Sequence, residues 1–312
     1  MSRVFVTGGA GYVGSVLVPQ LLATGHQVTV LDLFLFGDHL PAEGPGLAKI
    51  HGDIRADSLL ERLLPGHDAV IHLACISNDP SFELDPGLSR SINYECFEPL
   101  VAAAKASGVR RFIYASTSSV YGVSEAENVT EEHPLVPLTD YNKSKAVAER
   151  VLLSYEKDLV IQIIRPGTCC GVSPNQRLDI TVNGMVASAL CGRIEVANGD
   201  QYRPNIHIQD LTDLFAWMLE RPWLIGIWNA CAENMTGDEI AFLVGERVKA
   251  LIVRMQSKDR RSYRMSNAKL SRAGFMPRFG VEDAIDDLLR AGHKQSDSCY
   301  RVKSLQSLSF SA

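Results

Sequence analysis

The sequence predicts an α/β fold in which a doubly wound parallel sheet is covered by helices. Short runs rich in β-branched residues alternate with helix-like segments through the first half of the chain. Several of these runs, such as residues 69–73 and 160–164, are apolar at nearly every position, which is typical of strands buried on both faces. The length of 312 residues suits one large domain or two modest ones.

The expected elements alternate in the order that a parallel sheet requires, because each crossover between parallel strands needs a helix. The strands are expected at residues 3–7, 27–31, 68–73, 111–115 and 159–165, with a further one before Gly52. The helices that separate them are expected at residues 12–23, 58–64, 88–106 and 142–155.

The second part of the chain has a less regular pattern. After Arg165, loops of glycine, proline and asparagine separate shorter elements. We expect residues 1–165 to form the first domain and residues 166–292 to form a smaller lobe, with a strand near 225–229 returning to the first domain. The Ser- and Lys-rich segment 293–312 is expected to be a flexible tail.

Composition excludes several classes of protein. The net charge of −5 and the lack of a long Lys/Arg run disfavour nucleic acid as a partner. No apolar stretch approaches the roughly 20 residues that cross a bilayer, so no membrane partner is expected. The N-terminus lacks the layout of a signal peptide, which favours a cytoplasmic protein. The seven scattered cysteines include no Cys-x-x-Cys pair, which indicates reduced thiols and no metal site.

A glycine-rich turn follows the first expected strand. Gly8, Gly11 and Gly14 are spaced to allow a tight turn, a close approach of the backbone to a pyrophosphate, and packing of the next helix on the sheet. The N-terminus of that helix then presents unpaired N–H groups to the phosphates. The turn therefore predicts a dinucleotide site.

Two aspartates follow the next strands and bear on the choice of dinucleotide. Asp32 ends the second strand, where a carboxylate accepts hydrogen bonds from ribose hydroxyls and repels a 2′-phosphate. Residues 33–36 contain no Arg or Lys that would bind that phosphate, so NAD is favoured over NADP. Asp53 lies just past the third strand, where it is placed either to hydrogen-bond the adenine or to cap the following helix.

A tyrosine and a lysine begin the helix expected from residue 142. The four-residue spacing of Tyr141 and Lys145 puts them on one face, one turn apart. A neighbouring ammonium group, together with a positively charged nicotinamide, favours the phenolate and brings the pKa of a tyrosine toward neutral pH. Upstream, four consecutive hydroxyl residues at 116–119 follow the strand at 111–115, at the sheet edge where ligands bind.

Taken together, these segments resemble the extended short-chain dehydrogenase/reductase superfamily, in its NAD-dependent nucleotide-sugar epimerase/dehydratase branch, similar to UDP-glucose 4-epimerases. The resemblance spans nearly all of residues 3–290, in order. The matching segments are 7–14, Asp32, 52–53, 73–74, Asn93, 116–122, 141–145, 165–166, 203–210 and 263–264.

The resemblance implies a Rossmann domain with a smaller C-terminal substrate-binding lobe, bound NAD, and a homodimer formed through the helices at 88–106 and 142–155. It implies that Tyr141 is the catalytic base, Lys145 its activator and Thr117 the catalytic hydroxyl, and that Asn93 supports the lysine through water. The residues expected to bind NAD are Gly8, Gly11, Tyr12, Val13, Gly14, Asp32, Asp53, Ile54, Leu73, Ala74, Asn93, Tyr141 and Lys145.

A nucleotide sugar, UDP- or dTDP-linked, is the substrate that the resemblance implies. Arg203 resembles the arginine that grips the nucleotide diphosphate, and Arg264 a second phosphate contact. The residues expected to bind substrate are Asn78, Asp79, Thr117, Thr168, Arg203 and Arg264. Thr168 replaces the family's usual asparagine. For Asn78 and Asp79, a sugar contact and a simple turn are equally good readings of the residues.

One departure bears on the reaction. Dehydratases and decarboxylases of this family carry a carboxylate after the catalytic threonine, whereas residues 117–119 here are Thr-Ser-Ser. A serine is a poor general acid, which favours epimerisation, most often at the 4-hydroxyl, unless a carboxylate such as Asp79 substitutes. The alternatives are a reductase or dehydrogenase, an atypical dehydratase, and a non-catalytic dinucleotide-binding regulator. Such regulators tend to lose the Tyr or the Lys.

Overall fold

A seven-stranded parallel sheet forms the centre of the computed structural model, which describes residues 1–292. The strand order is β10-β6-β5-β4-β1-β2-β3, and every neighbouring pair is parallel. This confirms the predicted doubly wound α/β fold. The strands are β1 (Arg3–Thr7), β2 (Gln27–Asp32), β3 (Leu47–His51), β4 (Ala69–His72), β5 (Arg111–Ala115), β6 (Val160–Pro166) and β10 (Gly226–Ala230).

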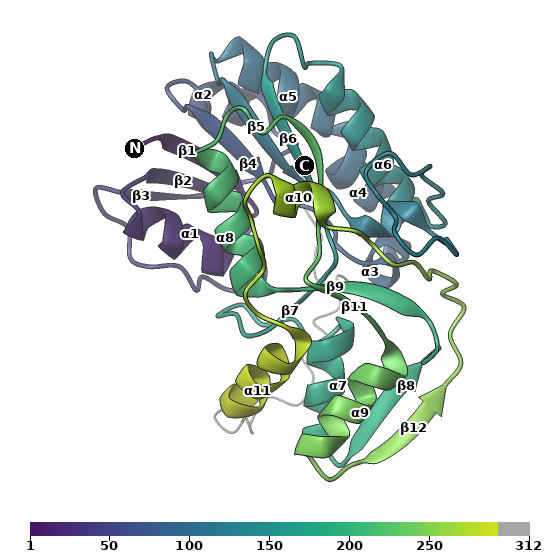
Figure 1. Ribbon diagram of the computed structural model, residues 1–312. Helices are drawn as coiled ribbons and strands as arrows, with labels where there is room; N and C mark the ends of the chain where they lie inside the picture. The colour runs from purple at the N-terminus through teal and green to yellow at the C-terminus, as the bar shows by residue number, and fades with distance from the viewer. Residues whose placement is uncertain (293–312) are drawn as a thin grey trace.

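Helices cover both faces of this sheet (Figure 1). On one face, α1 (Gly14–Ala23) packs beside α8 (Ile208–Leu219), and their leucines join the valines of β1 and β2 in one core. On the other face, α2 (Asp57–Leu63), α5 (Phe97–Ala106) and α6 (Asp140–Leu153) enclose a second core that contains Phe97 and Phe112. Burial on both faces explains why β4 and β6 are apolar at nearly every position.

The strand order reverses at β1, which lies between β2 and β4. Chain segments that leave the carboxyl ends of β1 and β4 therefore diverge to opposite sides and open a crevice, the usual ligand site of such sheets. The glycine-rich turn follows β1 and the segment 73–79 follows β4, so both lie at this crevice.

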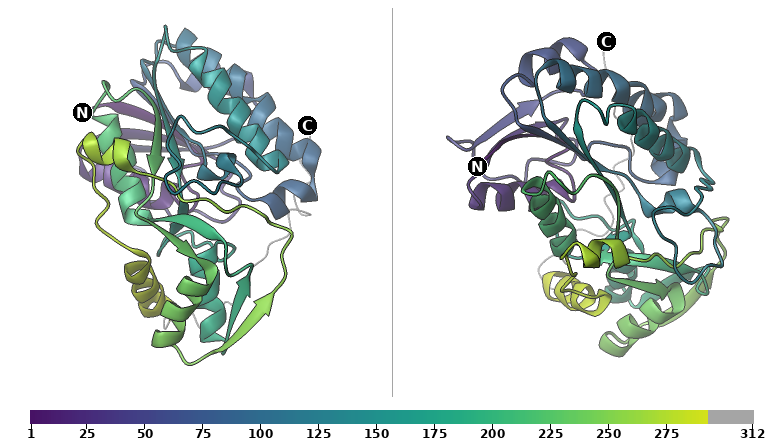
Figure 2. Two further views of the ribbon diagram at one scale, coloured as in Figure 1. Left: turned by 45° about the vertical axis from the view of Figure 1, so that its right-hand side comes forward. Right: turned by 45° about the horizontal axis from the view of Figure 1, so that its top comes forward.

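A smaller lobe lies below the carboxyl edge of the sheet (Figures 1 and 2). It has a core of its own, in which Val186, Ile194, Val244 and Ile285 are buried. Its elements are the strands β7 (Thr168–Cys170), β8 (Arg193–Ala197), β9 (Tyr202–His207), β11 (Glu233–Thr236) and β12 (Leu251–Met255), and the helices α7 (Thr181–Leu190), α9 (Gly237–Arg247) and α11 (Val281–Gly292).

The chain crosses between the two parts more than once after Arg165. Helix α8 packs on α1, strand β10 pairs with β6, and α10 (Ala268–Arg272) lies against β10. Strand β10 is therefore part of the large sheet and α8 and α10 pack with that part of the protein, although all three lie within residues 166–292. The segment expected to form a tail, residues 293–312, lies outside the described residues.

The helix expected at residues 88–106 is not continuous, so this prediction was wrong in detail. It is divided into α4 (Pro86–Arg90), a π-helical segment (Ser91–Glu95) and α5. Within the π-helical segment, the Asn93 side chain bonds to the backbone of Ile76 after β4, which ties the irregular turn to the crevice. Segments of π-helix are rare and often occur at functional sites.

Membrane-spanning helices and clusters of metal-ligating side chains were both sought within residues 1–292. None of the helices in residues 1–292 is long and apolar enough to cross a membrane. Within the same residues, no group of three or more His, Cys, Asp or Glu side chains is placed to hold a metal ion.

Candidate active site

The glycine-rich turn passes directly over the chain that leaves β4. Gly8 has φ +73°, and a Cβ atom there would lie 2.5 Å from the backbone nitrogen of Ala74. A Cβ on Gly14 would lie 2.4 Å from the carbonyl oxygen of Gly9. Only glycine fits these two positions, because the obstructing atoms are backbone. The turn therefore brings Gly8 beside Leu73 and Ala74, two other residues that the resemblance assigns to NAD.

Asp32 lies at the end of β2, at the edge of this turn. Its Oδ2 atom accepts a hydrogen bond from the Ala10 N–H at 2.9 Å, and its Oδ1 atom accepts one from the Phe34 N–H at 2.8 Å. Burial raises the pKa of Asp32, and these two backbone donors oppose that rise. Each carboxylate oxygen keeps a second lone pair, so the group remains able to accept hydrogen bonds from a diol.

Asp53 lies just past β3 and does not take the capping role that was one of its two expected roles. It forms a bidentate ion pair with Arg55, with Nε–Oδ1 at 3.0 Å and Nη2–Oδ2 at 2.6 Å. Burial raises the pKa of Asp53, and the pairing with Arg55 lowers it further than burial raises it. Helix α2 begins after Ala56 without a side-chain cap, so Asp53 does not cap it. Ile54, beside it, is buried.

Tyr12 and Val13, also assigned to the cofactor by the resemblance, lie between the turn and α1. The Tyr12 hydroxyl donates to the Gly171 carbonyl at 2.8 Å and accepts from Asn183 at 3.1 Å. Asn175 donates to the Ala10 carbonyl at 2.7 Å. These contacts fasten the loop after β7 onto the glycine-rich turn, so the Tyr12 hydroxyl joins the two parts of the chain.

Tyr141 lies in the first turn of α6, in the wall of a pocket. Thr139 caps this helix by accepting from the Asn142 N–H at 3.2 Å. Burial raises the pKa of Tyr141, and the nearby thiol of Cys75 acts in the same direction, whereas the guanidinium of Arg177 lowers it. The phenol is therefore the favoured form here, and forming the phenolate requires added positive charge.

Lys145 is buried one helical turn further along α6. Its ammonium donates to the Ala115 carbonyl at 2.8 Å and lies 4.9 Å from the centre of the Tyr114 ring. The hydrogen bond anchors the ammonium at the carboxyl end of β5. The expected lowering of the Tyr141 pKa by Lys145 is not what dominates in this structure, because the loss of solvation around the tyrosine outweighs the nearby cations.

The four hydroxyl residues after β5 differ in their partners. Ser116 donates to Glu149, and the Ser118 hydroxyl bonds to that of Tyr263 at 2.9 Å, so both are buried structural groups. The Thr117 hydroxyl lies 2.7 Å from that of Ser119, which donates to Asn142 in α6. Thr117 and Ser119 are thus the two hydroxyl residues that the loop leaves half-buried beyond β5, and Ser119 links Thr117 to the helix of Tyr141.

Asn93 and Asn78 hold the segment after β4 in place. The Asn93 side chain accepts from the Ile76 N–H and donates to the Ile76 carbonyl, both at 2.8 Å. Asn78 caps α3 (Asp79–Leu84) by accepting from the Ser81 N–H at 2.7 Å, and its amide donates to Asp179 in the lobe. The Asn93 contacts shown are with this segment rather than with Lys145.

Strands β11, β9 and β7 of the lobe form a three-stranded sheet, with Arg203 in β9. Arg203 Nη2 is 3.1 Å from Asp259 Oδ2, and the Arg264 guanidinium stacks 3.7 Å from the centre of the Tyr202 ring. Thr168 is the first residue of β7.

Two residues that the sequence did not single out also face this region. Arg261 contacts Asp79 at 2.8 Å and Asp259 at 2.7 Å. Arg177 forms an ion pair with Asp179 at 2.7 Å, and its charge reaches Tyr141. Neither arginine belongs to a recognisable motif, and only the fold brings them to the pocket.

The residues at the crevice fit NAD. The turn has glycine at Gly8 and Gly14, where a side chain would not fit, a carboxylate lies at the end of β2, and segment 33–36 carries no cation for a 2′-phosphate. The family model described as "NAD dependent epimerase/dehydratase family" matches residues 4–231. Over 264 residues the chain is 28% identical to UDP-arabinose 4-epimerase 1 of Arabidopsis thaliana. The match covers 73% of this chain but only 63% of the length of that relative.

Two solved structures have the same fold and contain NAD. One is a dTDP-glucose 4,6-dehydratase from Streptomyces venezuelae, with a TM-score of 0.85 and 26% identity over 94% of this chain and 97% of its own. The other is the UDP-glucose 4-epimerase of Thermus thermophilus, with a TM-score of 0.82 and 27% identity over 92% and 98%. The chain therefore belongs to the NAD dependent epimerase/dehydratase family.

Proposed function

We propose that this protein is a nucleotide-sugar epimerase that transiently oxidises a sugar hydroxyl, at the 4-position. The observation that carries the proposal is the placement of Tyr141 in a pocket wall, one turn from a buried Lys145, with Thr117-Ser118-Ser119 supplying no carboxylate. Epimerisation needs a base and a hydride acceptor but no further acid, because the same proton and hydride that leave the sugar are returned.

In this proposal Tyr141 removes the proton of the sugar hydroxyl while the carbon that bears it loses hydride. NAD, when bound, supplies the hydride acceptor and later the donor, and its positive nicotinamide supplies charge that favours the phenolate. Thr117 donates a hydrogen bond to the sugar oxygen, and Lys145 holds its ammonium at the carboxyl end of β5, one helical turn from the tyrosine. The keto-sugar then turns over, and Tyr141 returns the proton to the new hydroxyl.

The cofactor cradle in this proposal consists of the glycine-rich turn for the pyrophosphate and Asp32 for the adenosine ribose. We expect Asp32→Ala to weaken NAD binding at least about tenfold and to reduce discrimination against NADP, because a charge-assisted acceptor and its repulsion of a 2′-phosphate are lost together. Fluorescence titration with NADH and NADPH measures both effects. Equal affinities in wild type and variant would rule out the ribose role.

The substrate in this proposal is a UDP- or dTDP-sugar that lies between the large sheet and the lobe. Arg203 and Arg264 bind its diphosphate, and Thr168 lies at the sugar end. In the structure Asp259 balances the charge of Arg203, so we expect the diphosphate to displace or share this carboxylate. In this proposal the lobe within residues 166–292 binds the substrate. Helix α8, strand β10 and helix α10, which pack with the large sheet, are not part of that lobe.

A second candidate, an atypical dehydratase, is favoured by one observation. Asp79 lines the same pocket as Tyr141, so a carboxylate is present near the base although the Thr-Ser-Ser segment lacks one. Product analysis separates the candidates: a dehydratase releases a sugar nucleotide lighter by one water, whereas an epimerase leaves the mass unchanged. A reductase consumes NADH stoichiometrically, and a non-catalytic regulator binds NAD without turnover.

The decisive experiment uses the protein without added cofactor. Denaturation followed by mass spectrometry identifies the dinucleotide and any sugar nucleotide that it carries. The intact protein is then incubated with UDP-glucose, UDP-arabinose and dTDP-glucose, and the products are examined by NMR. Inversion at one carbon without change of mass supports the proposal. Loss of water, or no reaction with a panel of UDP- and dTDP-sugars, contradicts it.

Helices α5 and α6 pack side by side on the outer face of the large sheet (Figure 1). We propose a homodimer in which these two helices pair with their copies, in a cytoplasmic protein whose cysteines stay reduced. Sedimentation equilibrium of the purified protein is expected to give twice the chain mass of 34.2 kDa. A species of the single chain mass at micromolar concentration would refute the dimer.

A further inference from the structure

A chain of three polar side chains runs from α6 to the loop that follows β5. Asn142 Oδ1 accepts from the Ser119 hydroxyl at 2.7 Å, and Ser119 Oγ lies 2.7 Å from Thr117 Oγ1. Asn142 is 0% exposed, whereas Ser119 and Thr117 are half-buried. The chain therefore begins in the interior and ends at the hydroxyl that meets the sugar oxygen in the proposed function.

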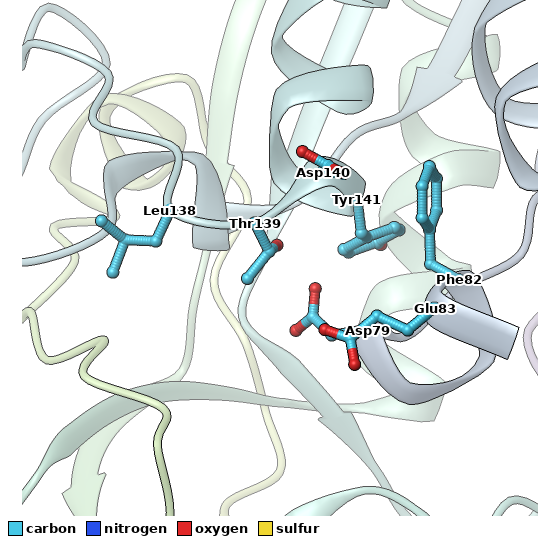
Figure 3. A pocket seen from close by; sticks show the side chains of 7 residues that line it. All are labelled: Asp79, Phe82, Glu83, Leu138, Thr139, Asp140 and Tyr141. Carbon is cyan, nitrogen blue, oxygen red and sulfur yellow. The ribbon is translucent and has the colours of Figure 1, made fainter. Parts of the chain in front are cut away.

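The inner end of this chain lies beside the proposed base. Asn142 directly follows Tyr141, which lines a pocket of about 230 Å³ between α3 and the start of α6 (Figure 3). Both residues lie in the first turn of α6, which Thr139 caps by accepting from the Asn142 N–H. The cap fixes the backbone of Asn142, so its side chain leaves the helix at a defined place and meets Ser119.

The number of protons determines which hydroxyl donates at each step of the chain. Ser119 has one hydroxyl proton and gives it to Asn142, so the hydrogen in its contact with Thr117 comes from Thr117. The Thr117 oxygen itself accepts from the Ser119 N–H at 3.2 Å. In this arrangement the Thr117 proton is directed toward Ser119. It has to turn away before Thr117 donates to a sugar oxygen.

The amide of Asn142 offers a second arrangement. Its Nδ2 atom is buried and has no hydrogen-bond partner among residues 1–292. A half-turn about the Cβ–Cγ bond exchanges Nδ2 and Oδ1, so that Nδ2 donates to Ser119, Ser119 donates to Thr117, and the Thr117 proton is released. Each arrangement has the same number of hydrogen bonds within the chain and leaves one buried amide atom without a partner. A ligand that accepts from Thr117 therefore selects the second arrangement.

Resting on the proposed function, we propose that Ser119 and Asn142 are positioning residues that set the direction of the Thr117 proton. When the sugar oxygen arrives, the chain takes its second arrangement, and Thr117 donates to that oxygen while it accepts from Ser119. A hydroxyl that accepts a hydrogen bond donates a stronger one, so the chain strengthens the contact of Thr117 with the oxygen as it becomes a carbonyl. No proton leaves the chain, because each hydroxyl turns about its own C–O bond.

A hydroxyl at position 119 is required for this role. Serine donates one hydrogen bond and accepts another at the same time, whereas an ionised carboxylate only accepts. A carboxylate at this position would hold the Thr117 proton on itself. The serine therefore meets a requirement of the chain, besides leaving the loop without a general acid.

The first test measures steady-state kinetics of the NAD-loaded protein with the sugar nucleotide that it epimerises. Ser119→Ala is expected to lower kcat about three- to tenfold, the equivalent of one lost hydrogen bond, and to leave KM within about twofold. Ser119→Thr keeps a hydroxyl at the same place and should retain kcat within about twofold. Ser154→Ala is the matched control, because it removes an exposed hydroxyl that donates to the Val151 carbonyl at the far end of the same helix. The control should match the wild type.

A double-variant cycle separates positioning from a general structural role. Thr117→Val removes the hydroxyl that the chain orients, so Ser119→Ala in that background should lower kcat by no more than about 1.5-fold further. A structural role of Ser119 would lower kcat by the same factor in both backgrounds. If Ser119→Ala fails to fold, as judged by its melting temperature and its NAD content, Ser119→Cys replaces it in the cycle, because a thiol is a weak donor and a weak acceptor.

Failure of the proposed function and failure of this inference give different results. If the wild type epimerises no UDP- or dTDP-sugar, the proposed function is wrong, and the chain has no sugar oxygen to serve. If the wild type is active and Thr117→Val is impaired, but Ser119→Ala keeps the wild-type kcat, the inference is overturned. Equal losses from Ser119→Ala with and without the Thr117 hydroxyl overturn it as well, and so does full activity of Thr117→Val.

Discussion

Tyr141→Phe is expected to lower the turnover number by a factor of about 10² to 10⁴, the range that a general base contributes. The substitution removes only the hydroxyl that, in the proposed function, accepts the substrate proton. The tyrosine is buried in the first turn of α6, and no hydrogen bond of its hydroxyl to another side chain in residues 1–292 supports the fold, so the phenyl ring should fill the same space. Steady-state kinetics with the substrate found by NMR measures the loss.

The accompanying binding measurement distinguishes a chemical defect from a structural one. NAD released from denatured Tyr141→Phe should equal that from wild type, because the glycine turn and Asp32 lie elsewhere in the crevice. Tyr94→Phe is a suitable control. It removes the same hydroxyl group from a tyrosine that is 44% exposed and does not line the pocket. Full activity in Tyr141→Phe would remove this residue from the mechanism.

The sequence predicts best those features whose cause is local. Gly8 must be glycine because its own φ is positive and its neighbour across the turn is backbone. The four-residue step from Tyr141 to Lys145 follows from helix geometry alone. The order of buried strands likewise follows from their continuous apolar runs, and the structure agrees with the parallel sheet that they predict.

Features that depend on contacts between residues far apart in the chain could not be predicted from the sequence. The bond from Arg261 to Asp79 joins residues 182 positions apart, and neither residue stands in a pattern that indicates the other. The π-helical segment around Asn93 depends on the backbone of Ile76 in another segment, so a helical period predicts one continuous helix. Asp53 was placed correctly at the strand end, but its side chain pairs with Arg55, two residues further along.

A buried ion pair beside the hydroxyl-bearing loop at residues 116–119 gives the largest expected effect on stability. Glu149 in α6 and Arg165 in β6 are 2% and 3% exposed, with Nη2–Oε2 at 2.5 Å and Nε–Oε1 at 2.9 Å. Glu149 also accepts from Ser116, the residue before Thr117, and Arg165 donates to the Tyr121 hydroxyl at 2.8 Å. The pair therefore joins α6, β6 and the hydroxyl-bearing loop.

Arg165→Met is expected to lower the free energy of unfolding by about 3–5 kcal/mol, because the Glu149 carboxylate is left buried without its counter-ion. Urea denaturation of the protein, followed by circular dichroism, measures this loss. The double variant Arg165→Met with Glu149→Leu should recover part of it, since both charges are then absent and the penalty for an unpaired ion disappears.

The exposed ion pair between Lys105 and Asp158 provides the comparison, since its partners are 47% and 42% exposed. Lys105→Met should cost no more than about 1 kcal/mol, because water solvates Asp158 when the lysine is gone. Equal losses in Arg165→Met and Lys105→Met would mean that burial does not set the cost of the inner pair. Because Ser116 depends on Glu149, a loss confined to Arg165→Met should be accompanied by reduced turnover at temperatures where the variant is still folded.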